Sequence, residues 1–314
     1  MFRRMLIAIV VANCLGLTAG SPGAEQLIGD ASNRPSGQPI TIHLKTRHSA
    51  VVLAGDELAK YLNVMADNPR AAAVVTDGTA KIQLGLLSDF SVAVDGVKDA
   101  SLDDAIYIDV QDSKGVIAGS NPRSVLFATY RFLESCGCRW IRPGPEGDYV
   151  PRRRVDNLSV QLKDKAAYRF RGNTNAGTYS IDYILSKIEW NAKVGLNTFY
   201  NEFLIPKKNY VNWYSRKYPS QKAPEPRSDA EILAYHELLN REVKRRGMLL
   251  QAGGHGFNAR FLGNPEIECD HEGVITIPDE KLEFLALVNG ERLKGRTPTT
   301  TELCYSRPDV QQGL

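Results

Sequence analysis

The chain has 314 residues, of which 43% are hydrophobic and 24% are charged, and its formal net charge at pH 7 is +3. These values describe an ordinary globular protein with a core, long enough for two domains. They argue against a nucleic-acid-binding protein, because basic runs such as 152–154 and 244–246 are isolated and no aromatic residues are interleaved with them.

The amino-terminal residues have the order of a secretory signal peptide. Arg3 and Arg4 precede an apolar run over residues 5–17, and small residues follow it. The run is too short to span a bilayer comfortably, so we expect no stable membrane span after cleavage. The sequence therefore predicts a signal peptide over 1–24, a flexible lead over 25–37, and export to the periplasm or the extracellular space.

The next part of the chain mixes strand and helix patterns. An apolar face over 58–65 predicts a helix. Short apolar or alternating runs predict strands over 40–44, 71–75, 81–84, 105–110 and 115–118. This mixture predicts a small α/β domain over 38–151. The charged segment 152–165 lacks a helical period and is predicted to be a linker.

A second helix is marked most clearly by its ends. Asn121 is typical of a helix N-cap, Pro122 follows at the first helical position, and Gly137 stops the helix. A short apolar run over 138–141 then leads into a proline–glycine turn. These residues predict a strand–helix–strand unit that completes the first domain.

From residue 166 the rhythm changes to an alternation of strands and helices. Strands are predicted over 168–171, 196–200, 248–252 and 302–306, and helices over 180–192, 230–246 and 279–290. Ser228 and Glu231 have the spacing of a capping box for the long helix. Because a complete eight-stranded barrel takes about 250 residues, 166–314 is predicted to be an incomplete (β/α)8 TIM-type barrel with about its first four β/α units.

Several motifs resemble the N-terminal α/β domain of the α-glucuronidase type, which precedes a catalytic barrel in several glycoside hydrolase families. They are Gly119–Arg123, Tyr130–Glu134, Gly137–Trp140, Pro143–Gly144, Val150–Pro151, Asp56–Leu62 and Lys81–Gly85. Tyr168–Gly172, Trp190–Lys193, Leu196–Phe199 and Gly254–Gly256 resemble the barrel opening of a largely uncharacterised family of secreted bacterial proteins. The resemblance covers roughly residues 38–310 and implies a protein that acts on glycosidic bonds.

Residues just past barrel strands form the active face of such folds. After the first predicted strand come Arg171 and Asn175. An arginine fork suits a pair of sugar hydroxyls or a uronate carboxylate, and a structural arginine is the alternative. The resemblance implies a sugar-binding arginine at this opening strand, so Arg171 and Asn175 are predicted substrate contacts.

Asn201 and Glu202 follow the second predicted strand and are also predicted substrate contacts. Glu202 is the one candidate for a catalytic acid. In the related retaining barrels an Asn–Glu pair follows the fourth strand instead, which argues against that role. The resemblance places the catalytic carboxylates after strand four and later, so the catalytic residues remain unknown.

His255 and Asn258 lie in a glycine-rich segment after the third predicted strand, where the backbone can approach a ligand closely. They are preferred sugar contacts, with a solvent-exposed turn as the alternative. No cofactor or metal is expected, since Cys136 and Cys138 lack a second Cys/His pair and are better explained as buried thiols. Cys269 and Cys304 would pair only if they are neighbours in space.

Together these observations predict a secreted, glycoside hydrolase-like protein that acts on or binds a glycosidic polysaccharide, and that is a truncated product of a longer parent. The alternative is a non-catalytic glycan-binding protein or an inactive remnant. A polysaccharide lyase with His255 and Arg171 is a third reading. Whether the chain is an enzyme is left open by the sequence, with hydrolysis of O-glycosyl bonds expected if the barrel is completed.

Overall fold

The computed structural model describes residues 38–76, 78–175, 179–202, 207–215, 223–253, 257–264, 275–292 and 301–313. Predictions about the signal peptide, the lead, His255 and Cys269 lie outside these residues. Among the described residues no helix is both long and apolar enough to cross a membrane.

The first sheet has six strands in the order β2-β1-β3-β5-β4-β8. Their bounds are β1 (Ile40–Leu44), β2 (Ala72–Val75), β3 (Ile82–Leu86), β4 (Ala105–Gln111), β5 (Lys114–Gly119) and β8 (Val160–Lys165). β1 pairs in parallel with β2 and β3, and β3 with β5, whereas β4 pairs antiparallel with β5 and β8. The five strands predicted for this part of the chain are confirmed.

β8 corrects the prediction of a linker over 152–165. Residues 160–165 form the edge strand of the first sheet, paired with β4 along its whole length. The strand is half-buried or exposed and polar, which is why its charge resembled that of a linker. The first sheet therefore extends to Lys165.

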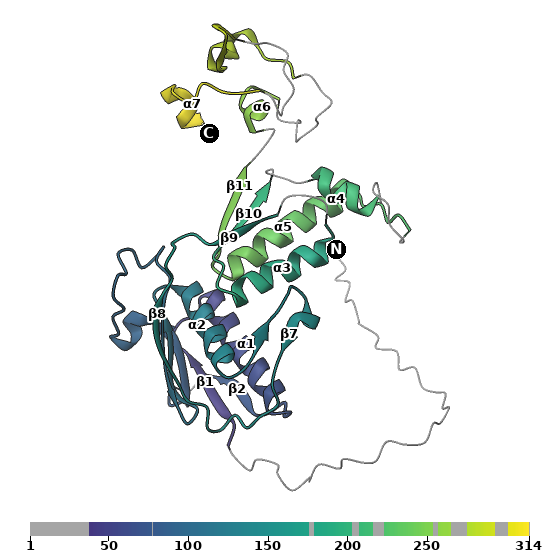
Figure 1. Ribbon diagram of the computed structural model, residues 1–314. Coiled ribbons are helices and arrows are strands. Elements are labelled where there is room, and N and C mark those ends of the chain that lie inside the picture. The colour runs from purple at the N-terminus through teal and green to yellow at the C-terminus, as the bar shows by residue number, and fades with distance from the viewer. Residues whose placement is uncertain are drawn as a thin grey trace, which may run out of the picture. The chain divides into compact units, whose positions relative to one another are not determined.

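Two helices, α1 (Ser49–Met65) and α2 (Pro122–Ser135), pack on each other and on the first sheet (Figure 1). α2 begins as predicted, since the Asn121 side chain accepts a hydrogen bond from the Ser124 amide and Pro122 occupies the first turn. Their buried faces, with Leu58 and Leu62 among them, form the largest apolar core. The short elements η1 (Leu87–Phe90), β6 (Arg139–Trp140), η2 (Pro145–Gly147) and β7 (Asp148–Tyr149) complete this part.

The second sheet contains three parallel strands in the order β11-β10-β9. They are β9 (Gly172–Asn175), β10 (Thr198–Glu202) and β11 (Leu249–Gly253), with helices α3 (Ile181–Lys193), α4 (Lys207–Tyr214) and α5 (Asp229–Arg245) between them. Phe199 on β10 is buried against Ile184 of α3 and Leu239 of α5 in one apolar cluster. The predicted capping box of α5 is confirmed at Ser228.

The mixed α/β class with a parallel sheet and helices is confirmed, but the fourth predicted β/α unit is wrong. Residues 279–290 hold η3 (Asp279–Phe284), β12 (Leu287–Val288) and part of the turn to β13 (Glu291–Arg292), not an α-helix. Within 302–306 only Leu303 pairs, in an isolated antiparallel bridge to Leu285. These residues, α6 (Phe257–Phe261) and α7 (Pro308–Gly313) surround a small apolar cluster of their own.

Candidate functional site

The three parallel strands of the second sheet end at one edge, which we call the carboxyl edge. β9 ends at Asn175 and β10 at Asn201 and Glu202, while Gly253 ends β11. In register, Asn201 lies between Asn175 and Ala252, and Glu202 lies opposite Gly253. The structure therefore brings together the backbones of three of the predicted site residues at the place where an α/β sheet presents its ligand-binding groups.

An amide pair forms at this edge. Asn175 Nδ2 donates to Asn201 Oδ1 at 3.3 Å, and the two residues are only 3% and 1% exposed. Asn175 Oδ1 and Asn201 Nδ2 are buried and have no hydrogen-bond partner among the described residues. The pair thus keeps one acceptor and one donor unused, whichever way the amides are oriented.

Such unpaired buried atoms are costly. Leaving a buried polar group without a partner costs about 1–3 kcal/mol, and native proteins contain few of them. A nearby pair shows the difference: Asn173 and Asn191 exchange hydrogen bonds in both directions, at 2.8 and 3.2 Å. The unused atoms at Asn175 and Asn201 therefore provide one acceptor and one donor for a hydrogen bond to a ligand or an ordered water.

The face of the second sheet opposite the helices carries polar side chains beside the same edge. Thr174 and Gln251 are exposed, and an ideal Cβ on Gly253 would lie 3.5 Å from Tyr200 Oη. Lys187 of α3 donates to the Thr174 carbonyl oxygen at 2.8 Å. Burial lowers the pKa of Lys187 from its ordinary value. Hydroxyl, amide and amine groups thus surround the ends of β9 and β10.

Arg171 does not lie at this edge, and its role as a sugar contact stays a prediction. The strand begins at Gly172, so Arg171 precedes β9 instead of ending it. Its guanidinium donates to the carbonyl oxygens of Gly195 and Tyr168 at 2.9 and 2.7 Å. The third nitrogen, Nη2, donates to Asp104 Oδ2 at 2.8 Å. The structural alternative considered for this arginine is therefore the one observed.

Asp104 is the centre of a polar network that joins the two sheets. Its side chain is 2% exposed, and Oδ1 accepts from Arg123 Nε at 2.8 Å while Oδ2 also accepts from Asn197 Nδ2 at 2.6 Å. Burial by itself would raise the pKa of Asp104, but the Arg123 charge and hydrogen bonds from Arg171, Asn121 and Ser124 hold it below its ordinary value. This network therefore favours the charged form of the carboxylate.

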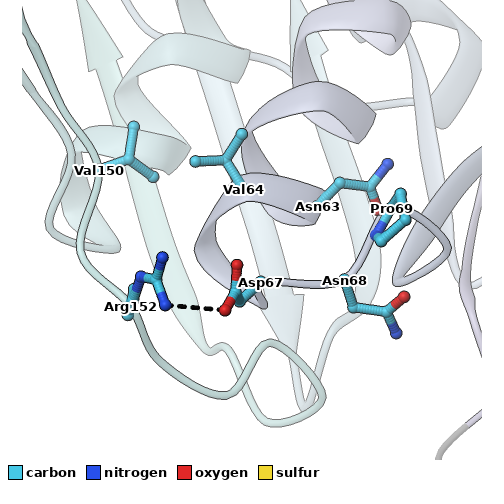
Figure 2. A pocket seen from close by; sticks show the side chains of 7 residues that line it. All are labelled: Asn63, Val64, Asp67, Asn68, Pro69, Val150 and Arg152. Atoms are coloured by element: carbon cyan, nitrogen blue, oxygen red, sulfur yellow. Dashed lines mark hydrogen bonds and ion pairs between the residues drawn. The ribbon is translucent and has the colours of Figure 1, made fainter. Parts of the chain in front are cut away.

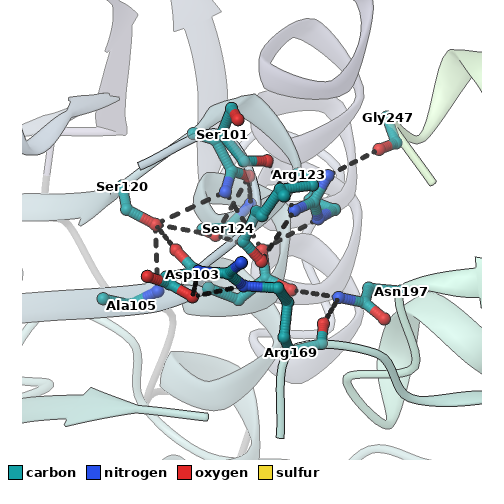
Figure 3. Close-up of polar contacts among 12 residues, drawn as sticks. Ser101, Asp103, Ala105, Ser120, Arg123, Ser124, Arg169, Asn197 and Gly247 are labelled. Carbon is teal, nitrogen blue, oxygen red and sulfur yellow. Dashed lines mark hydrogen bonds and ion pairs between the residues drawn. The ribbon is translucent and has the colours of Figure 1, made fainter. Parts of the chain in front are cut away.

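Asp103 repeats this connection beside it. Figure 3 shows Arg169 reaching Asp103 and Asn197 contacting the Arg169 carbonyl. Arg123 also extends to the Gly247 carbonyl oxygen, at 3.4 Å, in the turn before β11. The predicted Asn121–Pro122–Arg123 motif thus serves the junction between the sheets.

A second junction is built on Lys193 at the end of α3. Its side chain is 4% exposed, and Nζ lies 2.7 Å from both Asp148 Oδ2 and Glu189 Oε1. The ammonium group also lies 5.3 Å from the Trp140 ring centroid. Because Tyr61 donates to the same Asp148 oxygen at 2.6 Å, α1, β7 and α3 meet at one carboxylate.

The remaining predicted residues have structural contacts or lie outside the description. Asn258 donates to the Thr301 carbonyl oxygen at 2.8 Å and accepts from the Tyr305 hydroxyl at 3.0 Å, so its amide holds the carboxyl-terminal segment. Its role as a preferred sugar contact stays a prediction. His255 lies outside the described residues, and of Glu202 only the backbone is described.

Cysteines and possible metal ligands complete the survey. Cys136 and Cys138 are buried free thiols, as predicted, and burial raises their pKa values to about 11 and about 12. The described residues contain no cluster of three or more His, Cys, Asp or Glu side chains that could hold a metal ion.

Comparison with known proteins gives only distant structural matches. No protein family and no curated protein matches the sequence. A mutant Streptomyces plicatus β-hexosaminidase in complex with its product GlcNAc is 15% identical, with a TM-score of 0.46 over 88% of this chain and 51% of that chain. A Clostridium perfringens family 89 glycoside hydrolase in complex with PUGNAc is 13% identical, with a TM-score of 0.41 over 74% of this chain and 26% of that one.

The chain therefore spans about half the length of the hexosaminidase and about a quarter of the family 89 enzyme. An α-glucuronidase-type amino-terminal domain stays a prediction from the sequence motifs.

Proposed function

We propose that this protein is an exported, glycoside hydrolase-like protein that binds carbohydrate at the carboxyl edge of the second sheet. The observation that carries the proposal is the buried Asn175–Asn201 pair with its unused acceptor and donor. Export rests on the order of charged, apolar and small residues over 1–24. The relation to α-glucuronidases rests on the motifs between residues 119 and 151.

The chemistry of the amide pair fits sugar hydroxyls. A hydroxyl both donates and accepts, so one hydroxyl pair satisfies the Asn175 acceptor and the Asn201 donor together. A carboxylate offers acceptors only and would leave Asn175 Oδ1 unpaired. Because both amides are buried, an ordered water would connect them to the sugar hydroxyls.

Hydrolysis of a glycosidic bond adds a requirement for two carboxylates, one as general acid and one as nucleophile or base. Glu202 is the carboxylate that the chain itself carries at this edge, next to Asn201 and opposite Gly253. In a complete barrel, a second carboxylate from a later strand would face it across the sugar. The proposed reaction is therefore acid-catalysed hydrolysis of an O-glycosyl bond.

The second candidate function is glycan binding without catalysis. It is favoured by one observation: among the residues described at the carboxyl edge, Glu202 is the only one with a carboxyl group. With one carboxylate, the site binds a sugar but has no acid–base pair to cleave it.

One experiment tests both candidates. Binding of a panel of neutral and uronic-acid-containing oligosaccharides is measured by calorimetry on the full chain, and released reducing sugar is measured in parallel. Asn201→Leu is expected to abolish binding, whereas Asn173→Leu, which removes an asparagine from the same sheet away from this edge, retains it. Absence of binding to the whole panel by the folded chain would overturn the proposal.

Glu202→Gln then separates the two candidates. If the unmodified chain releases reducing sugar and the variant binds oligosaccharide without releasing it, the hydrolase is supported. Binding without turnover in the unmodified chain supports the glycan-binding protein.

A further inference from the structure

A pocket of about 350 Å³ lies at the junction between the two sheets, away from the carboxyl edge. We call it the junction pocket. It is formed by residues of α2, of β6 and its following residue, and of the turn after α3, and its wall includes Phe127, Arg131, Arg139, Trp140, Ile141 and Val194. Pockets at such junctions between structural units are preferred places for small ligands.

The wall is partly apolar and open to solvent. Ile141 is 71% exposed and Val194 is 40% exposed, which is unusual for large aliphatic side chains beside a pocket. Trp140 and Phe127 are buried behind them. Covering these exposed surfaces with the apolar face of a ring is favourable, because it removes apolar area from water.

The charge of the pocket is concentrated at Arg139. Its Nη1 donates to the carbonyl oxygens of Glu134 and Cys138, at 2.8 and 2.7 Å, so the guanidinium is held in place without a carboxylate. Among the described residues Arg139 has no acidic partner. The other two cations of the wall are neutralised, Arg131 by Glu134 and Lys193 by Asp148 and Glu189.

A second pocket of similar volume, about 340 Å³, shows that this arrangement is not general. It lies at the end of α1 and is lined by Asn63, Val64, Asp67, Asn68 and Arg152 among others (Figure 2). There the arginine is already paired, since Arg152 Nη1 lies 2.7 Å from Asp67 Oδ2. That pocket offers neither a free positive charge nor the aromatic residues of the junction pocket.

We infer that the junction pocket binds an acidic sugar unit of a glycan, with the ring against Ile141 and Val194 and its anionic group on Arg139. A carboxylate and a sulfate ester present the same fork of oxygens to a guanidinium, so both satisfy this chemistry. The inference rests on the proposed carbohydrate function. It adds a second, anion-selective subsite to the neutral site at the carboxyl edge.

The test measures affinity by calorimetry on the full chain with four probes. They are a galacturonic acid hexamer, its carboxyl-reduced neutral counterpart, maltohexaose, and sulfated maltohexaose. We expect at least one acidic probe to bind more tightly than its neutral counterpart. Arg139→Gln is expected to weaken that binding about tenfold, because a charge-assisted hydrogen bond is lost at an exposed side chain.

Two further variants keep the inference falsifiable. Ile141→Ser is expected to weaken binding several-fold. It should leave the fold intact, because the Ile141 side chain is exposed. Arg152→Gln removes the same charge at the other pocket and is expected to change nothing. Comparison of the two acidic probes identifies whether carboxylate or sulfate is the preferred group, and either result supports the subsite.

Three outcomes would overturn it. Equal affinity for acidic and neutral probes removes the role of the charge. Equal weakening by Arg139→Gln and Arg152→Gln shows a general charge effect. Binding that Asn201→Leu abolishes and Arg139→Gln leaves unchanged places the glycan at the carboxyl edge alone, so that the subsite fails while the proposed function stands.

Discussion

Nη2 of Arg171 lies 2.8 Å from Oδ2 of Asp104, across the boundary between the second sheet and the first. Oδ1 of the same carboxylate accepts a hydrogen bond from Arg123 Nε, also at 2.8 Å. Two cations from different parts of the chain therefore meet at one buried anion. The arginine that sequence patterns assign to the sugar site is instead part of the connection between the sheets.

Replacing Asp104 with asparagine removes the only carboxylate shown between these two arginines. Breaking a buried ion pair by removing one partner typically costs about 3–5 kcal/mol, because the remaining charge stays uncompensated. We expect Asp104→Asn to lower the free energy of unfolding by about that amount in urea denaturation. Asp67→Asn, which removes an exposed pair with Arg152, should cost less than about 1 kcal/mol. Equal costs for the two variants would contradict the assignment.

Arg171→Gln should affect stability and not glycan binding. The variant loses an ion pair and two hydrogen bonds to carbonyl oxygens, for which we expect a loss of about 1–3 kcal/mol in the free energy of unfolding. The dissociation constant of any bound oligosaccharide, measured under conditions where the variant is folded, should stay unchanged. A weaker affinity at unaltered stability would return Arg171 to the sugar site.

Asp103 predicts how stability depends on pH. Hydrogen bonds from the Asp99 and Lys98 amides and from Arg169 lower its pKa to about 2. Because the folded pKa lies below the ordinary value of 3.8, the carboxylate stabilises the fold fully above pH 3.8, and this contribution is lost as the pH falls toward 2. Urea denaturation between about pH 5 and about pH 2 should show a smaller decline in stability for Asp103→Asn than for the unmodified chain. Parallel curves for variant and parent would refute this.

The cysteines should differ in reactivity. Burial raises the pKa values of Cys136 and Cys138, whereas the hydrogen bond with Ser306 lowers the pKa of Cys304, which is partly exposed. In a chain carrying Cys14→Ser and Cys269→Ser, a thiol reagent such as iodoacetamide should label Cys304 first. Cys136 and Cys138 should react only after unfolding, as mass spectrometry of the labelled peptides would show. Labelling of either residue in the folded chain would contradict the burial of these two thiols.

Local signals predicted those parts of the structure that local chemistry controls. The N-caps Asn121 and Ser228 bind the amides that their sequence positions indicate, because the partner lies three residues away. The carboxyl edge was predictable in part, since the strand pattern over 196–200 leads directly to Asn201, whereas the strand that ends at Asn175 was predicted four residues too early. The unused atoms of this pair could not be predicted, because they depend on the register between β9 and β10.

Long-range contacts account for the errors. Residues 168–171 alternate like a strand, but their arginines bind Asp103 and Asp104 in the first sheet, and the strand begins at Gly172, four residues after the predicted start. A shift of this size moves Arg171 from the carboxyl end of a strand to its start. Likewise, residues 279–292 and 301–306 contribute to a small local cluster, so their apolar pattern does not indicate a helix and a strand of the barrel.

Asp104 also orders events during synthesis. Its Oδ1 partners Asn121, Arg123 and Ser124 lie within 20 residues along the chain, whereas the Oδ2 partners Arg171 and Asn197 lie 67 and 93 residues away. During synthesis the hydrogen-bond partners of Oδ1 therefore emerge from the ribosome well before those of Oδ2. Until residues 171–197 are synthesised, the Oδ2 atom of Asp104 lacks the partners that join the first sheet to the second.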